Sequence, residues 1–127
     1  MHDLTDIGGY SMAKYEAPRL DRPWTEVNPG GIVLESANSE AYITGTWRTL
    51  RPVRDMVQCT QCLICWIMCP DSSITIEDGK VTGFDYDHCK GCGICAEQCP
   101  VNVKQPHSVT GAMGKVIQMV PETNFDA

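Results

Sequence analysis

Residues 59–70 read CTQCLICWIMCP, and residues 89–100 read CKGCGICAEQCP. Both segments have the spacing C-x2-C-x2-C-x3-C-P, and their first cysteines lie 30 positions apart (89 − 59). Together the two segments contain all 8 cysteines of the chain. Two copies of one pattern indicate an internal duplication, in which each copy presents its thiols in the same order.

This spacing favours [4Fe–4S] clusters over other uses of cysteine. A cubane cluster needs one thiolate at each of its irons, and a C-x2-C-x2-C segment can wrap around three of them. In two-cluster ferredoxins the fourth cysteine of each run binds the other cluster. We therefore predict two [4Fe–4S] clusters with crossed ligands. The predicted sets are Cys59, Cys62, Cys65 and Cys99 for cluster 1, and Cys89, Cys92, Cys95 and Cys69 for cluster 2.

Zinc and disulfides are the alternative uses of these cysteines. Zinc sites are typically built from separated C-x2-C pairs, which would leave the third and fourth cysteine of each run without a role. Disulfides require an oxidising compartment. The start of the chain, residues 1–6, has no basic or apolar leader, and no apolar stretch approaches the length of a membrane span. We therefore expect a cytoplasmic location with no membrane span.

Several residues beside the ligands have expected roles. Gly91 and Gly93 lack a Cβ, so the backbone can approach an inorganic core closely. Trp66 is expected to pack over a cluster. His88 precedes a ligand, but four cysteines already satisfy each cluster, so we expect no ligation by it. His107 is expected to lie in solvent.

The composition excludes some functions. The chain has 10 Lys and Arg against 16 Asp and Glu, a net charge of −6, which disfavours nucleic-acid binding. It lacks a dinucleotide fingerprint, a phosphate-binding loop and a nucleophile elbow. We predict no catalytic residues on this chain, which should move electrons while bond chemistry occurs elsewhere.

Around the cysteine runs the pattern predicts short strands. Residues 73–82 alternate apolar and polar side chains, and Asp78-Gly79 suits a tight turn, so we predict a β-hairpin. Residues 115–120 are predicted to form a final strand. We predict a ferredoxin-like domain over residues 53–127.

Residues 1–52 contain no cysteine and are predicted to form an extended arm that binds a partner protein. Residues 32–34 and 41–43 are candidate strands within it. Trp24, Tyr42 and Trp47 favour partner binding over disorder, because aromatic residues often anchor interfaces.

The two runs resemble those of bacterial 2[4Fe–4S] ferredoxins, which implies an α+β fold of short β-hairpins and two short helices. The segments around the two runs restrict this resemblance to one family. The segments TGTWRTLRP at residues 44–52, CLICWIMCP at 62–70 and DYDHCKGCGICAEQCP at 85–100 resemble the ferredoxin-like delta subunit of 2-oxoacid:ferredoxin oxidoreductases. The chain departs from that family in residues 1–29 and in a longer link at 102–114.

The resemblance implies a place in a larger complex. Larger catalytic subunits of that family hold thiamine diphosphate and Mg²⁺ and convert a 2-oxo acid to an acyl-CoA. The delta subunit passes the electrons to an external ferredoxin or another acceptor. Pyruvate is the default substrate, while an aromatic or branched 2-oxo acid and an NAD-linked electron outlet remain open.

Two other functions remain open. One is a free-standing 2[4Fe–4S] ferredoxin, and the other is a zinc-stabilised interaction module. Within the leading prediction, Arg48, Arg51 and Arg54 are expected to form ion pairs with a partner subunit, or alternatively to attract an acidic ferredoxin.

Overall fold

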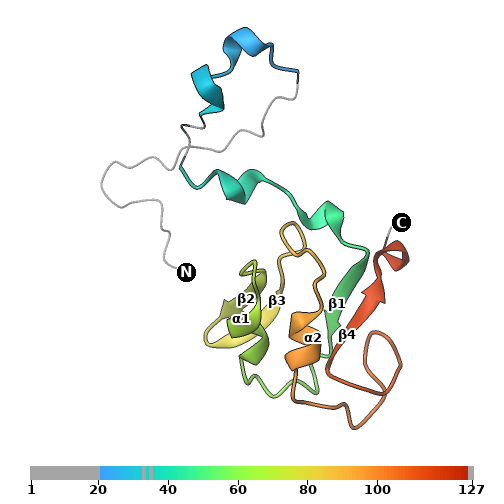
Figure 1. The fold of residues 1–127 in the computed structure, drawn as a ribbon. Helices are drawn as coiled ribbons and strands as arrows, with labels where there is room; N and C mark the ends of the chain where they lie inside the picture. The colour runs from blue at the N-terminus through green and yellow to red at the C-terminus, as the bar shows by residue number, and fades with distance from the viewer. Residues whose placement is uncertain (1–20, 33, 35, 126–127) are drawn as a thin grey trace. The chain divides into compact units, whose positions relative to one another are not determined.

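The computed structural model describes residues 21–32, 34 and 36–125 (Figure 1). The chain divides into two compact units, residues 1–42 and residues 43–127. In the first unit, short 3₁₀ helices cover Trp24–Glu26, Pro29–Gly31 and Asn38–Ala41. The prediction of strands at 32–34 and 41–43 is wrong for the residues described there, because Ala41 closes a 3₁₀ helix and neither segment has a pairing strand. Val33 lies outside the described residues.

The second unit contains four strands and two short helices. In chain order these are β1 (Leu50–Arg54), α1 (Ile64–Met68), β2 (Ile74–Glu77), β3 (Lys80–Phe84), α2 (Ile94–Gln98) and β4 (Ile117–Pro121). Further 3₁₀ helices cover Gly45–Trp47 and Glu122–Asn124. No helix in the described part of the chain has the length and apolar character needed to cross a membrane.

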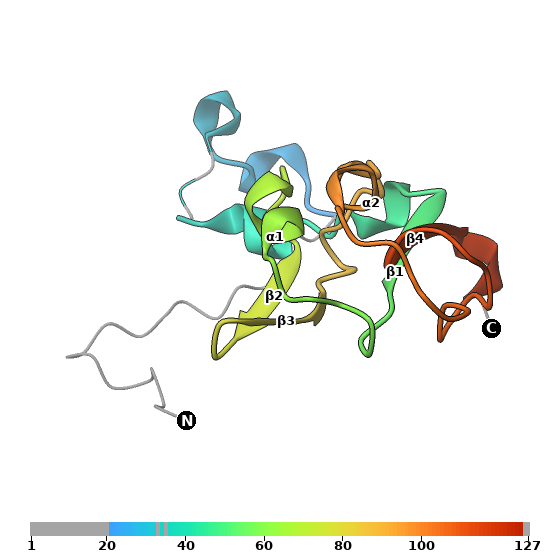
Figure 2. The same ribbon diagram turned by 90° about the horizontal axis from the view of Figure 1, so that it is seen from below.

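The strands form two antiparallel pairs, β1 with β4 and β2 with β3 (Figures 1 and 2). The two helices contact each other, and α1 also contacts β2 while α2 contacts β4. The predicted α+β, ferredoxin-like fold is confirmed.

The elements repeat with the same offset as the cysteines. The strands β1 and β3 start at residues 50 and 80, and the helices α1 and α2 start at residues 64 and 94, so both pairs have the offset of the two cysteine runs. Copy 1 is therefore β1–α1–β2 and copy 2 is β3–α2–β4. Each strand pairs with a strand of the other copy. The two copies are interlocked, and neither has a sheet of its own.

Copy 2 is longer than copy 1. The strands β2 and β4 start at residues 74 and 117, so their offset is larger than the one shared by the other elements. The additional length lies in the link between α2 and β4.

The predicted hairpin and final strand are confirmed. The turn between β2 and β3 places Asp78 at φ 49° and Gly79 at φ 73°. A tight hairpin turn of this kind needs positive φ at both central residues, which explains the Asp-Gly pair. The final strand, β4, starts slightly later than predicted, at Ile117.

The buried core is small and contains cluster ligands predicted from the sequence. Its members are Cys65, Ile74, Val81, Cys95, Cys99, Val103, Val116 and Ile117. Small domains often need a bound metal to remain folded. Because cysteines make up part of this core, its packing depends on what these cysteines bind.

The long link of copy 2, residues 102–114, forms hydrogen bonds with the segment before the first cysteine run. The Asp55 carboxylate is 1% exposed and accepts the Ser108 amide at 3.0 Å and the Gln58 side-chain amide at 2.8 Å. The Gln58 side-chain oxygen accepts the backbone amides of Lys104 and Gln105 at 2.7 and 3.0 Å. The Ser108 amide, together with other donors, holds the pKa of Asp55 well below its usual range. The link is therefore ordered around two side chains of copy 1.

His107 supports the link from inside. The expectation that it lies in solvent is wrong, because the residue is only 1% exposed. Its Nδ1 accepts the amides of Val109 and Thr110 at 3.1 and 3.3 Å, so the proton lies on Nε2, which donates to the Val116 carbonyl at 3.0 Å. The folded-back link excludes water from the ring.

Candidate metal centre

The cysteines surround two separate cavities. Cys59, Cys62, Cys65 and Cys99 line cavity 1, and Cys69, Cys89, Cys92 and Cys95 line cavity 2. Each group corresponds to one of the two ligand sets predicted above, while ligation itself remains a prediction. Within residues 21–32, 34 and 36–125, no three or more His, Cys, Asp or Glu side chains gather as a single-ion site would require. Cysteines that surround a space match the need of a cubane, whose four irons are separated.

The backbone turns the first three thiols of each run toward one cavity. In copy 1, Gln61 and Leu63 have φ values of 59° and 63°, and in copy 2, Gly91 and Gly93 have 69° and 78°. These left-handed residues alternate with the cysteines and bend the chain around the cavity. The third cysteine of each run then lies inside a short helix and is buried.

The fourth cysteine of each run makes the crossing. Cys69 closes α1 but lines cavity 2, and Cys99 follows α2 but lines cavity 1. The contact between the two helices brings each fourth cysteine toward the cavity of the other copy.

The surroundings of the thiols suit an anionic cluster. Burial raises the pKa of Cys65 and Cys89, and raises the pKa of Cys95 to about 12. Backbone amides one or two residues further along donate to these sulfurs, and the Ser73 amide lies 3.3 Å from the sulfur of Cys69. Metal coordination deprotonates such thiols outright. The four thiols in each cavity and their amide donors therefore fit a four-thiolate cluster.

The segment that leads into β1 packs against the first loop of copy 2. We call residues 44–51 the strap. The Gly45 amide donates to the Asp87 carbonyl at 2.7 Å, and a Cβ on Gly45 would lie 1.9 Å from the Tyr86 carbonyl oxygen. A Cβ on Gly91 would lie 2.2 Å from the Leu50 carbonyl oxygen. Gly91 thus permits the strap to approach, whereas its predicted proximity to an inorganic core remains untested.

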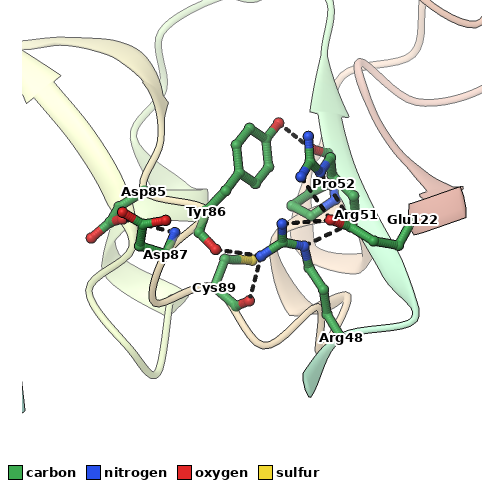
Figure 3. A network of polar contacts seen from close by, with 8 residues as sticks. All are labelled: Arg48, Arg51, Pro52, Asp85, Tyr86, Asp87, Cys89 and Glu122. Carbon is green, nitrogen blue, oxygen red and sulfur yellow. Dashed lines mark hydrogen bonds and ion pairs between the residues drawn. The ribbon is translucent and has the colours of Figure 1, made fainter. Parts of the chain in front are cut away.

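Arginines of the strap join it to the end of the chain (Figure 3). Arg48 and Arg51 each bind the Glu122 carboxylate through two nitrogens, with Nη2–Oε1 distances of 2.6 and 2.7 Å. Arg48 also donates to the Tyr86 carbonyl and, at 3.2 Å, to the Cys89 carbonyl. These contacts lower the pKa of Glu122 to about 2, chiefly through its hydrogen bonds with Arg48.

The two arginines are therefore used inside the domain. Their side chains are only 6% and 19% exposed. The Arg51 guanidinium lies 4.1 Å from the centre of the Tyr86 ring and 4.6 Å from that of Phe125. Neither expected role, in ion pairs with a partner or in attracting an acidic ferredoxin, fits Arg48 and Arg51, because both roles require exposed guanidinium groups.

Two further expectations concern neighbours of the ligands. Trp66 is 46% exposed, and neither it nor His88 belongs to the described lining of the cavities. The packing of Trp66 over a cluster stays a prediction, and His88 pairs with Asp85 at 2.7 Å.

The sequence reasoning missed Asp55, Glu122 and the strand β1. The duplication contains a signal for two of them. Asp55 and Asp85 occupy equivalent places in the two copies, and each accepts amides at the start of its cysteine run. Likewise β1 precedes β3 by the offset of the cysteine runs. Glu122 has no such signal, because its partners lie in a segment far earlier in the chain.

Comparison with known proteins identifies the class of the domain. A family profile described as the 4Fe-4S binding domain matches residues 82–105, which include the second cysteine run. With the fold and the two cavities, this match defines a 4Fe–4S protein of the ferredoxin-like class.

Relatives that match more of the chain identify the family. The chain is 40% identical over 104 residues to pyruvate synthase subunit PorD of Thermotoga maritima, covering 82% of this chain and 92% of that protein. It is 45% identical over 76 residues to PorD of Methanocaldococcus jannaschii, covering 60% and 88%. It is 43% identical over 58 residues to the delta subunit of NADH-dependent phenylglyoxylate dehydrogenase from Aromatoleum evansii, covering 46% and 61%. The chain belongs to the family of ferredoxin-like delta subunits of 2-oxoacid oxidoreductases that includes PorD.

Proposed function

We propose that this chain relays low-potential electrons through two [4Fe–4S] clusters within a thiamine-diphosphate-dependent 2-oxoacid oxidoreductase. The observation that carries the proposal is the pair of cavities, each lined by four cysteines from both copies of the repeat. Cys59, Cys62, Cys65 and Cys99 would hold cluster 1, and Cys69, Cys89, Cys92 and Cys95 would hold cluster 2. When bound, such clusters supply one-electron oxidation and reduction.

The other residues of the chain shape the surroundings of these thiols. Val81, Val116 and Ile117 line cavity 1, and Ile74 and Phe84 line cavity 2. Apolar walls limit access of water, and amide donors near sulfur stabilise negative charge. The chain would thus hold and insulate redox groups, while thiamine diphosphate and Mg²⁺ would be held by larger catalytic subunits.

Pyruvate is the substrate that we propose for the complex. The relatives from Thermotoga maritima and Methanocaldococcus jannaschii, covered over 92% and 88% of their length, are named pyruvate synthase subunits. The third relative is named for phenylglyoxylate and NADH, but it is covered over only 61% of its length. An assay of the native complex with CoA and a panel of straight, branched and aromatic 2-oxo acids tests this choice. A clear preference for an aromatic or branched acid would refute it.

We further propose that the first unit, residues 1–42, and the exposed start of the second unit bind a catalytic subunit. Trp24 and Tyr42 are 85% and 59% exposed, and Trp47, in the second unit, is 65% exposed. Exposed aromatic side chains are frequent anchors of protein interfaces. Removal of residues 1–42 tests this role and leaves Gly45 and the strap in place. Loss of co-purifying larger subunits with clusters retained is the expected result, whereas full assembly would contradict it.

Anaerobic purification tests the cluster proposal itself. We expect a brown protein with about eight iron and eight sulfide ions per chain, since each cubane contains four of each. A colourless preparation with stoichiometric zinc would instead support the interaction module. A native mass equal to that of the isolated chain would support the free ferredoxin. The proposed site of action is the cytoplasm, in keeping with eight free cysteines.

A further inference from the structure

Arg54, at the end of β1, is a buried cation without a counter-ion among the described residues. The residue is 7% exposed, and its Nη2 donates to the Val81 carbonyl at 2.7 Å. Its Nε and Nη1 are buried and have no hydrogen-bond partner in the described part of the chain. The carboxylate of the adjacent Asp55 instead accepts amides of the loops around it. The Arg54 charge is therefore not compensated by these protein groups.

An unpaired buried charge is costly. Removing an ion from water carries an effective penalty of several kcal/mol unless an opposite charge or a set of hydrogen bonds compensates it. Arg48 shows the usual solution in this protein, since its guanidinium is paired with Glu122 and two carbonyls. Arg54 has one carbonyl partner and no carboxylate among the described residues, so its counter-charge would come from another group.

The position of Arg54 indicates that a group bound in cavity 1 supplies this negative charge. Its acceptor, Val81, lines cavity 1 with four cysteines. The described residues that line this cavity include no charged side chain apart from the cysteines as thiolates. A cluster held by four thiolates is anionic and gains a further negative charge on reduction.

The internal duplication gives independent support. Arg54 is the last residue of β1 and Phe84 is the last residue of β3, so the two occupy equivalent places in the repeat. Phe84 lines cavity 2. Arg54 does not itself line cavity 1, but it binds the carbonyl of Val81, which does, and its place in the repeat is the one from which Phe84 lines cavity 2.

We propose that Arg54 is the counter-ion of cluster 1, and that its buried charge raises the reduction potential of that cluster. The proposal rests on the function proposed above, in which Cys59, Cys62, Cys65 and Cys99 hold this cluster. A fixed positive charge favours the more negative, reduced state, and water screens a buried charge weakly. Arg54 would thus help to determine the order in which the two clusters accept electrons.

Redox titration of the intact chain or complex, followed by electron paramagnetic resonance, tests this role. Arg54→Met removes the charge and keeps most of the apolar volume. We expect it to shift the oxidised-to-reduced equilibrium of one cluster about tenfold toward the oxidised form, or about 59 mV to lower potential. The second cluster should move much less. Lys80→Met, which removes an exposed positive charge from β3, is the matched control and should leave both potentials near the wild-type values, because water and salt screen a surface charge.

Arg54→Lys separates charge from packing. It should retain the wild-type potential, because the positive charge remains, even if Arg54→Met fails to incorporate cluster 1. An unshifted potential in Arg54→Met, or loss of cluster 1 in both variants, would overturn the role of Arg54. Absence of iron and sulfide from the wild-type chain would instead overturn the proposed function.

Discussion

Copy 1 and copy 2 of the repeat have the same cysteine spacing and the same order of elements but different surroundings. Copy 1 places Gln61 and Leu63 at positive φ where copy 2 has Gly91 and Gly93. Copy 2 is covered by the strap and contains the longer link, whereas copy 1 contains Arg54 at the place of Phe84. The shared cysteine spacing thus accompanies a similar course of the chain around both cavities. The strap, the longer link and Arg54 each occur at only one copy, and they make the surroundings of the two cavities different.

The largest expected effect concerns the crossing of the fourth cysteines. Cys69 belongs to copy 1 in sequence but lines cavity 2, and Cys99 belongs to copy 2 but lines cavity 1. Cys69→Ser should remove about half of the iron and spare cluster 1, because a cubane needs each of its thiolates. Cys99→Ser should do the reverse. Cys62→Ser and Cys92→Ser serve as references, because each removes a predicted ligand of cluster 1 or cluster 2. Iron analysis and electron paramagnetic resonance then show which cluster each variant lacks. A Cys69→Ser spectrum that matches that of Cys62→Ser would contradict the crossed assignment.

The strap predicts a large effect at Gly91. Gly91→Ala should lower the free energy of unfolding by about 3 kcal/mol or more, because overpacking against the Leu50 carbonyl adds to the left-handed backbone penalty. Gly93→Ala is the matched control, since its nearest neighbour would be Met119 Cγ at 3.9 Å. It should cost about 1–2 kcal/mol, from the backbone alone. Chemical unfolding under anaerobic conditions measures both, and equal losses would show that the strap does not constrain copy 2.

Glu122 connects the strap to the end of the chain. Glu122→Gln should lower the free energy of unfolding by about 2 kcal/mol at neutral pH, since charge-assisted hydrogen bonds to two arginines are lost. Because the pKa of Glu122 falls from 4.5 to about 2 on folding, its stabilisation is fully present above pH 4.5 and is lost as the pH falls toward 2.

The difference between wild type and Glu122→Gln should therefore shrink below about pH 4.5, measured over the range in which iron content stays constant. Glu77→Gln, at an exposed position of β2, serves as the control and should have little effect at any pH. A difference that stays constant on acidification would contradict the pairing.

The smallest effect is expected at the counterpart of Gly91 in copy 1. Gln61→Gly relieves a left-handed φ of 59° but removes the hydrogen bond from the Val81 amide to the Gln61 side chain at 2.8 Å. These contributions are each about 1 kcal/mol and have opposite sign, so the net change should lie within about 0.5 kcal/mol. The same unfolding measurement applies. A loss comparable to that of Gly91→Ala would mean that copy 1 also depends on this position.

The sequence was most informative where structure follows from local patterns. The hairpin around Asp78-Gly79 and the strand β4 were predicted from alternation and turn chemistry, and both are present. The strands expected at 32–34 and 41–43 rested on short apolar runs bounded by glycines, and the described residues there pair with no other strand, so apolar character alone was insufficient. His107 was misjudged because its burial depends on how residues 102–114 fold back toward Val116, the residue before β4.

By itself, the sequence determined the cysteine spacing, the duplication and the family, because these depend on residue identity and local order. The tertiary structure alone decided which strands pair, how Glu122 meets Arg48 and Arg51, and that Arg54 is buried without a partner. Pairing and burial arise from contacts between segments far apart in the chain, and no local pattern encodes them. The grouping of the cysteines around the two cavities could thus be predicted from the sequence, whereas the electrostatic surroundings that would distinguish one cluster from the other could not.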